Sequence, residues 1–155
     1  LHKKAFSRVL EDDMSVLEDY AKIRGTLNSA IQNGLRDNVA DGLKKAIQSE
    51  AKDKVYSYQA TPSAMNRRRK DNGGLIDDVT MLTSVDGLTL TLENTAEPQH
   101  ASGIPLTPIV EGGWSRWHQP GPREFMDQAC GKYVDNGGAD SDLADALRGA
   151  GFEVI

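Results

Sequence analysis

The sequence predicts an α+β fold in which long N-terminal helices pack on a small antiparallel sheet, with further helices toward the C-terminus. Three observations support this prediction: helical apolar spacing through most of residues 15–58, a strictly alternating segment after an Asp-Gly pair, and two more helical patterns in the last third of the chain. At 155 residues the chain is expected to form a single domain, 1–155, with a modest core.

Helices are expected to fill most of residues 15–58, after a flexible N-terminal segment at 1–14. Gly25 and Gly34 each cost about 1 kcal/mol relative to alanine inside a helix, so a break near one of them is expected. The first pattern places these residues on one side: Leu17, Tyr20, Ala21, Leu27, Ala30, Ile31 and Leu35. The second has Val39, Leu43, Ala46, Ile47, Ala51, Val55 and Tyr58.

A β-hairpin is predicted at residues 79–93. Asp86-Gly87 separates two apolar runs, which is typical of a tight turn with positive φ. The second strand alternates, with Leu88, Leu90 and Leu92 on the face expected to lie on the helices. Long loops are expected on both sides of the hairpin, at 59–77 and 94–104.

The remaining elements are mostly helical. Residues 105–111 are expected to form either a short helix or a third strand. Pro122 suits the first turn of a helix that ends at Asn136, and Asp140 or Ser141 is expected to cap the last helix. The final four residues, 152–155, predict a strand or an anchor.

Composition excludes several classes of protein. The net charge of −5 argues against attraction of the whole molecule to nucleic acid or anionic membrane. Cys130 is the only cysteine, so an intramolecular disulfide and a cysteine-based zinc site are excluded. We see neither a signal peptide nor an apolar run long enough to span a membrane, and hydrophobic residues at 38% suggest a chain that orders fully only in an oligomer.

Catalytic and metal-binding patterns are not evident in the sequence. A site built from His100, His118 and Glu111 is conceivable, but these residues lie in or beside expected loops, and solvent-exposed or interface histidines are favoured. There is no G-x-S-x-G elbow or phosphate loop, and a Cys130–His118 nucleophile pair has no supporting signature. We therefore expect no enzyme activity, no cofactor and no metal.

Two loop segments are candidate interfaces. The only basic run is Arg67, Arg68, Arg69 and Lys70, for which contact with an acidic neighbouring subunit is favoured over nucleic acid. Trp114 and Trp117 flank Arg116 in a second loop, where tryptophan acts either as a core plug or as an interface anchor. Glu111 completes the set of interface candidates.

Several short motifs resemble the tail-completion, or head–tail joining, family of long-tailed bacteriophages, whose members include neck and minor capsid-type proteins. The resemblance spans about residues 39–152. It rests on Val55-Tyr56-Ser57-Tyr58, Asn66-Arg67-Arg68-Arg69, Asn72-Gly73-Gly74-Leu75-Ile76-Asp77, Glu93-Asn94-Thr95-Ala96, Pro105-Leu106, Ile109-Val110-Glu111-Gly112-Gly113 and Pro122-Arg123-Glu124-Phe125. Gly112 stands where the family usually has an aromatic residue.

The resemblance implies a non-enzymatic structural protein of the virion, assembled in the host cytoplasm. Copies would form a homo-oligomeric ring, sixfold or twelvefold, at the head–tail junction. Implied partners are connector or stopper proteins on one side and tail tube or terminator proteins on the other, with DNA only as passing cargo and no membrane. The alternatives are a tail terminator or head-closure ring and, in another class, a small nucleic-acid-binding accessory protein.

Overall fold

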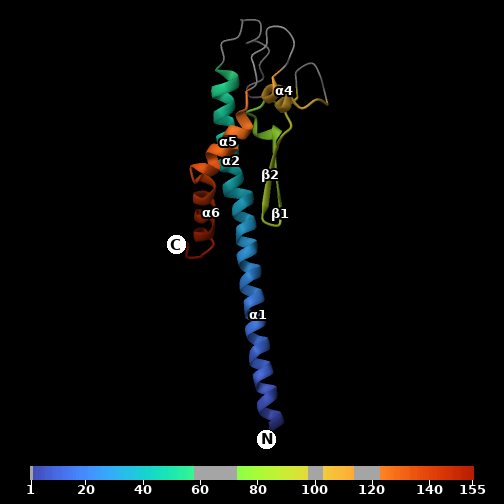
Figure 1. Cartoon of the computed structure of the whole chain (residues 1–155), viewed down its shortest axis with the longest axis vertical. Coiled ribbons are helices and arrows are strands. Elements are labelled where there is room, and N and C mark those ends of the chain that lie inside the picture. Colours follow the sequence, from blue (N-terminus) through green and yellow to red (C-terminus); the bar gives the residue numbers. More distant parts are fainter. Residues whose placement is uncertain (1, 58–72, 98–102, 114–122) are drawn as a thin grey trace.

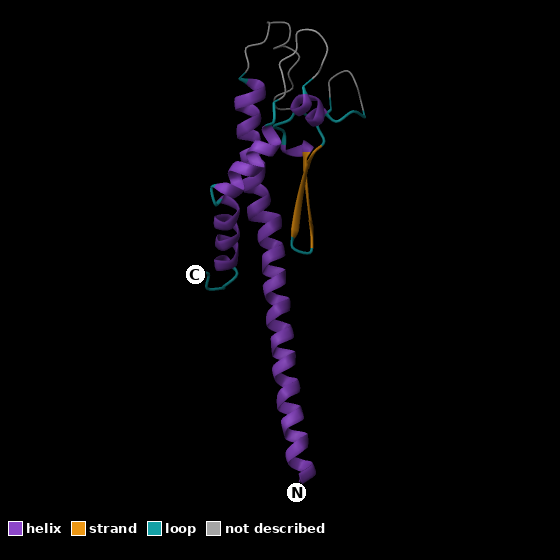
Figure 2. Cartoon of the chain, viewed as in Figure 1, coloured by secondary structure: helices purple, strands orange, loops and turns teal. Residues whose placement is uncertain are grey.

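A helical rod of residues 2–56 is the main feature of the molecule (Figure 1). It consists of α1 (His2–Gly34), the π-helical turn η1 (Leu35–Val39), α2 (Ala40–Ala51) and a second π-helical turn η2 (Lys52–Tyr56). The computed structural model describes residues 2–57, 73–97, 103–113 and 123–155, with side chains from Val16 onward. The other described elements gather around the C-terminal half of the rod, and the N-terminal part of α1 projects away from them (Figure 2).

The rod begins earlier and bends less than the sequence suggested. The first helix starts at His2 instead of near Ser15, and no glycine or proline precedes Gly25 to interrupt it. Helical structure continues through Gly25, and the only change of register near the expected break is η1, directly after Gly34. The prediction of helices is confirmed, but the expected break is a π-helical turn inside a continuous rod.

The hairpin is confirmed, with its turn displaced by one residue. After a short 3₁₀ turn η3 (Asp78–Thr80), β1 (Met81–Asp86) pairs antiparallel with β2 (Thr89–Asn94). Asp86 pairs with Thr89, which leaves Gly87 and Leu88 as the turn, and Gly87 has φ of 57°. Leu88 is therefore 60% exposed instead of facing the helices, whereas Leu90 and Leu92 are half-buried as predicted.

The C-terminal part of the chain is helical. The ambiguous segment forms α4 (Leu106–Gly112), which decides for the helix over the strand, and α5 (Phe125–Asp135) and α6 (Gly138–Gly149) follow. The start of α6 corrects the prediction of a side-chain cap at Asp140 or Ser141. Its N-cap is Gly137, with φ of 72° and no side-chain cap, because only two residues separate α6 from α5.

The last four residues form no strand, and of the four only Phe152 makes a described contact with the rest of the chain. The Phe152 amide donates to the Leu147 carbonyl at 3.0 Å, which turns the chain back after α6. The half-buried Phe152 side chain lines a groove of about 400 Å³ against α1, together with Asp19, Lys22, Ile23 and Thr26.

The core lies where α2 and α5 cross beside the base of the hairpin. Its buried members come from both helices and from the ends of both expected loops: Ile47, Ala51, Val55, Leu75, Met81, Ala96, Phe125 and Ala129. Burial of Leu75 and Ala96 shows that the expected loops 59–77 and 94–104 are packed at their hairpin ends. The α+β class predicted from the sequence is confirmed.

Glycines let α6 approach the rod closely. A Cβ on Gly34 would lie 2.9 Å from the Ala146 Cβ, and one on Gly42 would collide with the side chains of Tyr133 and Asp142. The Tyr133 hydroxyl donates to Asp142 at 2.6 Å, and burial together with this carboxylate raises the pKa of Tyr133. The glycine expected to weaken the helix at position 34 is thus a packing residue.

Candidate interaction surfaces

Most of the residues proposed as interface contacts lie outside the described part of the chain. These are Arg67, Arg68, Arg69, Lys70, Trp114, Arg116 and Trp117. Glu111 is described, on α4, and is half-buried. Its Oε1 accepts a hydrogen bond from the Met126 amide at 2.7 Å, which caps the first turn of α5. The carboxylate therefore connects two helices within the protein.

Arg123 and Lys54 tie the end of the rod to the start of α5. The Arg123 Nη1 donates to the Val55 carbonyl at 3.2 Å, near the last turn of the rod. In the other direction, the Lys54 ammonium donates to the Glu124 carbonyl at 3.4 Å and to the Gln128 side chain. Both contacts satisfy carbonyl or amide oxygens close to the points where the described chain is interrupted, at residues 57 and 123.

Asp77 organises the turn that leads into the hairpin. Its carboxylate accepts from the Gly73 amide at 2.7 Å and from the Val79 amide at 3.1 Å. These two bonds hold the pKa of Asp77 below its usual value, because they favour the charged carboxylate. The Thr80 hydroxyl is 2.8 Å from both the Gly74 and the Asp77 carbonyls, so the turn is closed by its own polar groups.

Asn94 joins this turn to the end of the hairpin. It is 5% exposed; its Nδ2 donates to the Leu75 carbonyl at 2.9 Å, and its Oδ1 accepts from the Ala96 amide at 3.1 Å. The Tyr56 hydroxyl accepts from the Leu75 amide at 3.1 Å. Buried backbone groups of residues 75 and 96 are thereby satisfied by side chains, which a buried irregular segment requires.

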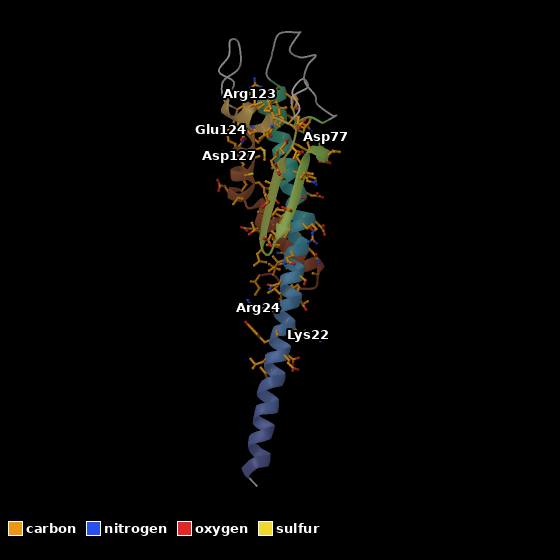
Figure 3. The ribbon with its side chains drawn as sticks, turned by 90° about the vertical axis from the view of Figure 1, so that its right-hand side faces the viewer. Lys22, Arg24, Asp77, Arg123, Glu124 and Asp127 are labelled. Atoms are coloured by element: carbon orange, nitrogen blue, oxygen red, sulfur yellow. The ribbon has the colours of Figure 1, made fainter. Side chains whose placement is uncertain are left out.

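We call this set the loop platform: Tyr56, Asp77, Asn94, Glu111 and Arg123. All five come from the motifs that carry the family resemblance, and each bonds a backbone group. Every interruption of the described chain begins and ends beside the platform, at the end of the molecule opposite the N-terminus (Figure 1). Figure 3 shows Asp77 and Arg123 at this end and Lys22 and Arg24 far along α1. The platform therefore holds the described residues that flank the three interruptions.

Reactive chemistry is not apparent at the platform. No group of three or more His, Cys, Asp or Glu side chains within the described residues is placed to hold a metal ion. Cys130 is half-buried, and burial, followed by Asp127 and Glu111, raises the pKa of its thiol. A raised pKa keeps the thiol protonated and therefore a poor nucleophile.

The hairpin presents an acidic surface. Residues 77–97 contain five carboxylates and no lysine or arginine: Asp77, Asp78, Asp86, Glu93 and Glu97. Asp86 and Glu93 lie on the outer face of the strands and are exposed. Such a surface disfavours nucleic-acid phosphates and favours basic protein surfaces.

An apolar face of α1 is uncovered, which the sequence analysis did not predict. Val16, Leu17, Tyr20 and Ile23 are 64–67% exposed, although the spacing placed Leu17 and Tyr20 on the helix side expected to pack. The sequence signal for this exposed face was the length of the apolar helical pattern, which is greater than the length of α6, the helix that packs on it. An exposed set of large apolar residues on one helix face marks an interaction surface.

Comparison with known proteins places the chain in a family. The model of the YomN family matches residues 18–149, and the chain belongs to this family. YomN is a phage-derived family, named for a protein of a Bacillus prophage. No curated protein and no solved structure matches it. Among the described residues, no helix combines the length and the apolar character that a bilayer span requires.

Proposed function

We propose that this protein is a non-enzymatic structural component of the virion that forms a ring at the head–tail junction and docks the tail to the connector. The YomN family supports a phage role of some kind. The observation that carries the more specific role is the loop platform, in which the motif residues serve backbone hydrogen bonds and position loops. A protein that works by presenting loops to neighbours needs this arrangement, and an enzyme would need converging reactive groups instead.

The proposed partners are copies of the same chain, in a sixfold or twelvefold ring, a connector or stopper protein, and a tail tube or terminator protein. DNA passes only as cargo. The acidic hairpin and the net charge of −5 support a surface along which DNA slides without binding. A tail terminator or head-closure ring has the same requirements and differs only in its neighbours. The same charges weigh against the nucleic-acid-binding alternative, which rests on Arg67 to Lys70.

Deletion of the gene from an inducible prophage tests this function. The expected result is DNA-filled heads and complete tails that remain separate in electron micrographs, restored to joined particles by a plasmid copy. Joined particles without the protein would overturn the proposal, and empty heads or absent tails would move the function to another stage of assembly.

The tryptophan loop gives a sharper version of the same experiment. A plasmid copy with Trp114→Ala and Trp117→Ala is expected to leave heads and tails unjoined while its circular dichroism spectrum matches that of the wild type. If the doubly substituted protein unfolds, the two tryptophans are core residues and the loop is not an interface.

A further inference from the structure

The uncovered face of α1 has the spacing of a coiled-coil seam. Val16, Tyr20, Ile23, Leu27, Ala30 and Gly34 follow one another at intervals of four, three, four, three and four residues. This alternation places residues on one stripe of a helix and is typical of helices that pack side by side. We call these six residues the α1 stripe.

The upper part of the α1 stripe already packs against a helix within the chain. Leu27 and Ala30 are half-buried, and a Cβ on Gly34 would meet Ala146 and Leu143 of α6. Beyond the end of α6, Phe152 borders the stripe in the groove beside Ile23, but the stripe is largely exposed: Val16 and Tyr20 are each 66% exposed and Ile23 is 64% exposed. The open part is therefore continuous with an established helix–helix interface.

Charged residues border the stripe with opposite signs. At 100° per residue, Asp19 lies on one flank of the stripe and Arg24 on the other, and Glu18 lies on the far side of the helix. Neither Asp19 nor Arg24 makes an ion pair with another described residue. In parallel coiled coils, a residue on one flank of the seam faces the residue five positions later on the opposite flank of the neighbouring helix. Asp19 and Arg24 lie on opposite flanks and are five positions apart.

We infer that α1 of a second copy packs in parallel against the open α1 stripe, with Asp19 of one copy facing Arg24 of the next. The inference rests on the ring proposed above and names its self-association surface. Copies related by rotation about a ring axis have helices that run in the same direction, and each copy uses one flank toward each neighbour. Opposite charges on the two flanks meet this requirement.

The helix is long enough for such a contact. From His2 to Ile23, α1 extends about 33 Å at 1.5 Å per residue, which is about three heptads. Toward the N-terminus the sequence places Val9 and Phe6 on the same stripe, seven and fourteen residues before Val16 and Tyr20, with Asp13 at the stripe position between Val9 and Val16. A second copy supplies an apolar surface of matching length and the complementary charge.

A charge exchange in the full-length protein tests the pairing. Asp19→Arg and Arg24→Asp are each expected to weaken association about tenfold at low salt, because each places like charges across the contact. The variant with both changes restores the pair in reversed order and is expected to associate within about threefold of the wild type, since the pair itself is only exchanged. Glu18→Arg makes the same change of charge on the far side of the helix and serves as the matched control. Association is measured by sedimentation velocity.

The apolar contact is tested separately by Tyr20→Asp combined with Val16→Asp. Both side chains are exposed, so the protomer is expected to fold, as circular dichroism would show, while its oligomer is lost. If the oligomer persists in this variant, or if the double charge variant does not recover association, the α1 stripe is not the contact surface. Neither result contradicts the ring itself.

Failure of the inference and failure of the proposed function give different results. A wild-type protein that stays monomeric at high concentration would overturn both the ring and its α1 contact. An oligomer that obeys the charge exchange, in a phage whose heads and tails join without the protein, would keep the α1 contact and overturn the role at the head–tail junction.

Discussion

The two ends of the rod carry similar apolar patterns in opposite surroundings. In α2, Ile47 and Ala51 are fully buried, whereas in α1 Tyr20 and Ile23 are 66% and 64% exposed. Burial of a side chain such as Ile47 stabilises the fold by about 1.5–3 kcal/mol, a contribution that the exposed residues of α1 cannot make in the isolated chain. The difference follows from what lies beside each end: α5 and the hairpin base cover α2, and α6 ends before it reaches Tyr20.

The comparison separates residues that hold the protomer together from those available to a partner. The covered end is also where side chains of the loop platform bond backbone groups. The open end has large apolar residues and unmatched charges on a projecting helix. Substitutions at the first end should change the free energy of unfolding, and substitutions at the second should change association.

The largest expected effect is at Phe125, which is fully buried in the core against α2. Phe125→Ala is expected to lower the free energy of unfolding by about 3–5 kcal/mol, because it removes a buried ring and leaves a cavity. Tyr20→Ala, at the open end, is expected to change it by less than about 0.5 kcal/mol. Urea unfolding of both variants in an Arg24→Asp background, at a concentration at which sedimentation velocity shows a monomer, excludes the contribution of self-association. Similar losses at the two positions would contradict the comparison.

Two glycines on the same rod should respond with opposite signs. Gly42→Ala is expected to destabilise the protein by about 1–3 kcal/mol, because the added Cβ would overlap the side chains of Tyr133 and Asp142. Gly25→Ala has no atom within 4 Å of its new Cβ and is expected to stabilise the protein by about 1 kcal/mol through helix propensity. Thermal unfolding of the two variants is the measurement, and stabilisation by both substitutions would show that Tyr133 of α5 and Asp142 of α6 do not pack closely on α2 at Gly42.

The smallest effect is a pH dependence at the covered end. Glu50 accepts a hydrogen bond from the Lys132 ammonium and lies 3.7 Å from that of Lys54, and its pKa is lowered, chiefly by Lys132. Since the folded pKa lies below the unfolded value, this stabilisation is present above about pH 4.5 and is lost as the pH falls through the folded pKa. Lys132 is 58% exposed, so the contribution is about 0.2–1 kcal/mol.

Glu50→Gln tests this contribution through urea midpoints at about pH 7 and about pH 3. The variant is expected to lose stability at the higher pH and to match the wild type at the lower. Asp37→Asn, which changes an exposed acid on η1, is the control. An equal loss at both pH values would show that packing of the Glu50 stem, and not its charge, is responsible.

Local patterns predicted the type of most elements. Helical spacing predicted the rod, and Gly87 predicted the hairpin turn, because each depends on residues close together in the sequence. The turn centre and the start of α6 were less predictable. Strand pairing decided that Leu88 belongs to the turn, and the two-residue link after α5 decided that Gly137 precedes α6.

For the candidate surfaces too, the sequence identified some residues, while the tertiary contacts determined what those residues do. Of the platform residues, only Glu111 was singled out as a candidate from the sequence, and the other four were members of the motifs without an assigned role. Their roles as backbone hydrogen-bond partners depend on contacts between residues far apart in sequence, such as Arg123 with Val55. Interface roles for Arg67 to Lys70, Trp114, Arg116 and Trp117 stay predictions, since these residues lie outside the described ranges.

The sequence by itself determined that the chain has a long amphipathic helix and a hairpin, because these depend on local spacing and turn chemistry. Only the tertiary structure decided which part of that helix is buried. The apolar spacing is the same from Val16 to Gly34, and the length and position of α6 leave its first half open. Periodicity states which face of a helix is apolar, and whether that face meets the same chain or another is settled by what packs beside it.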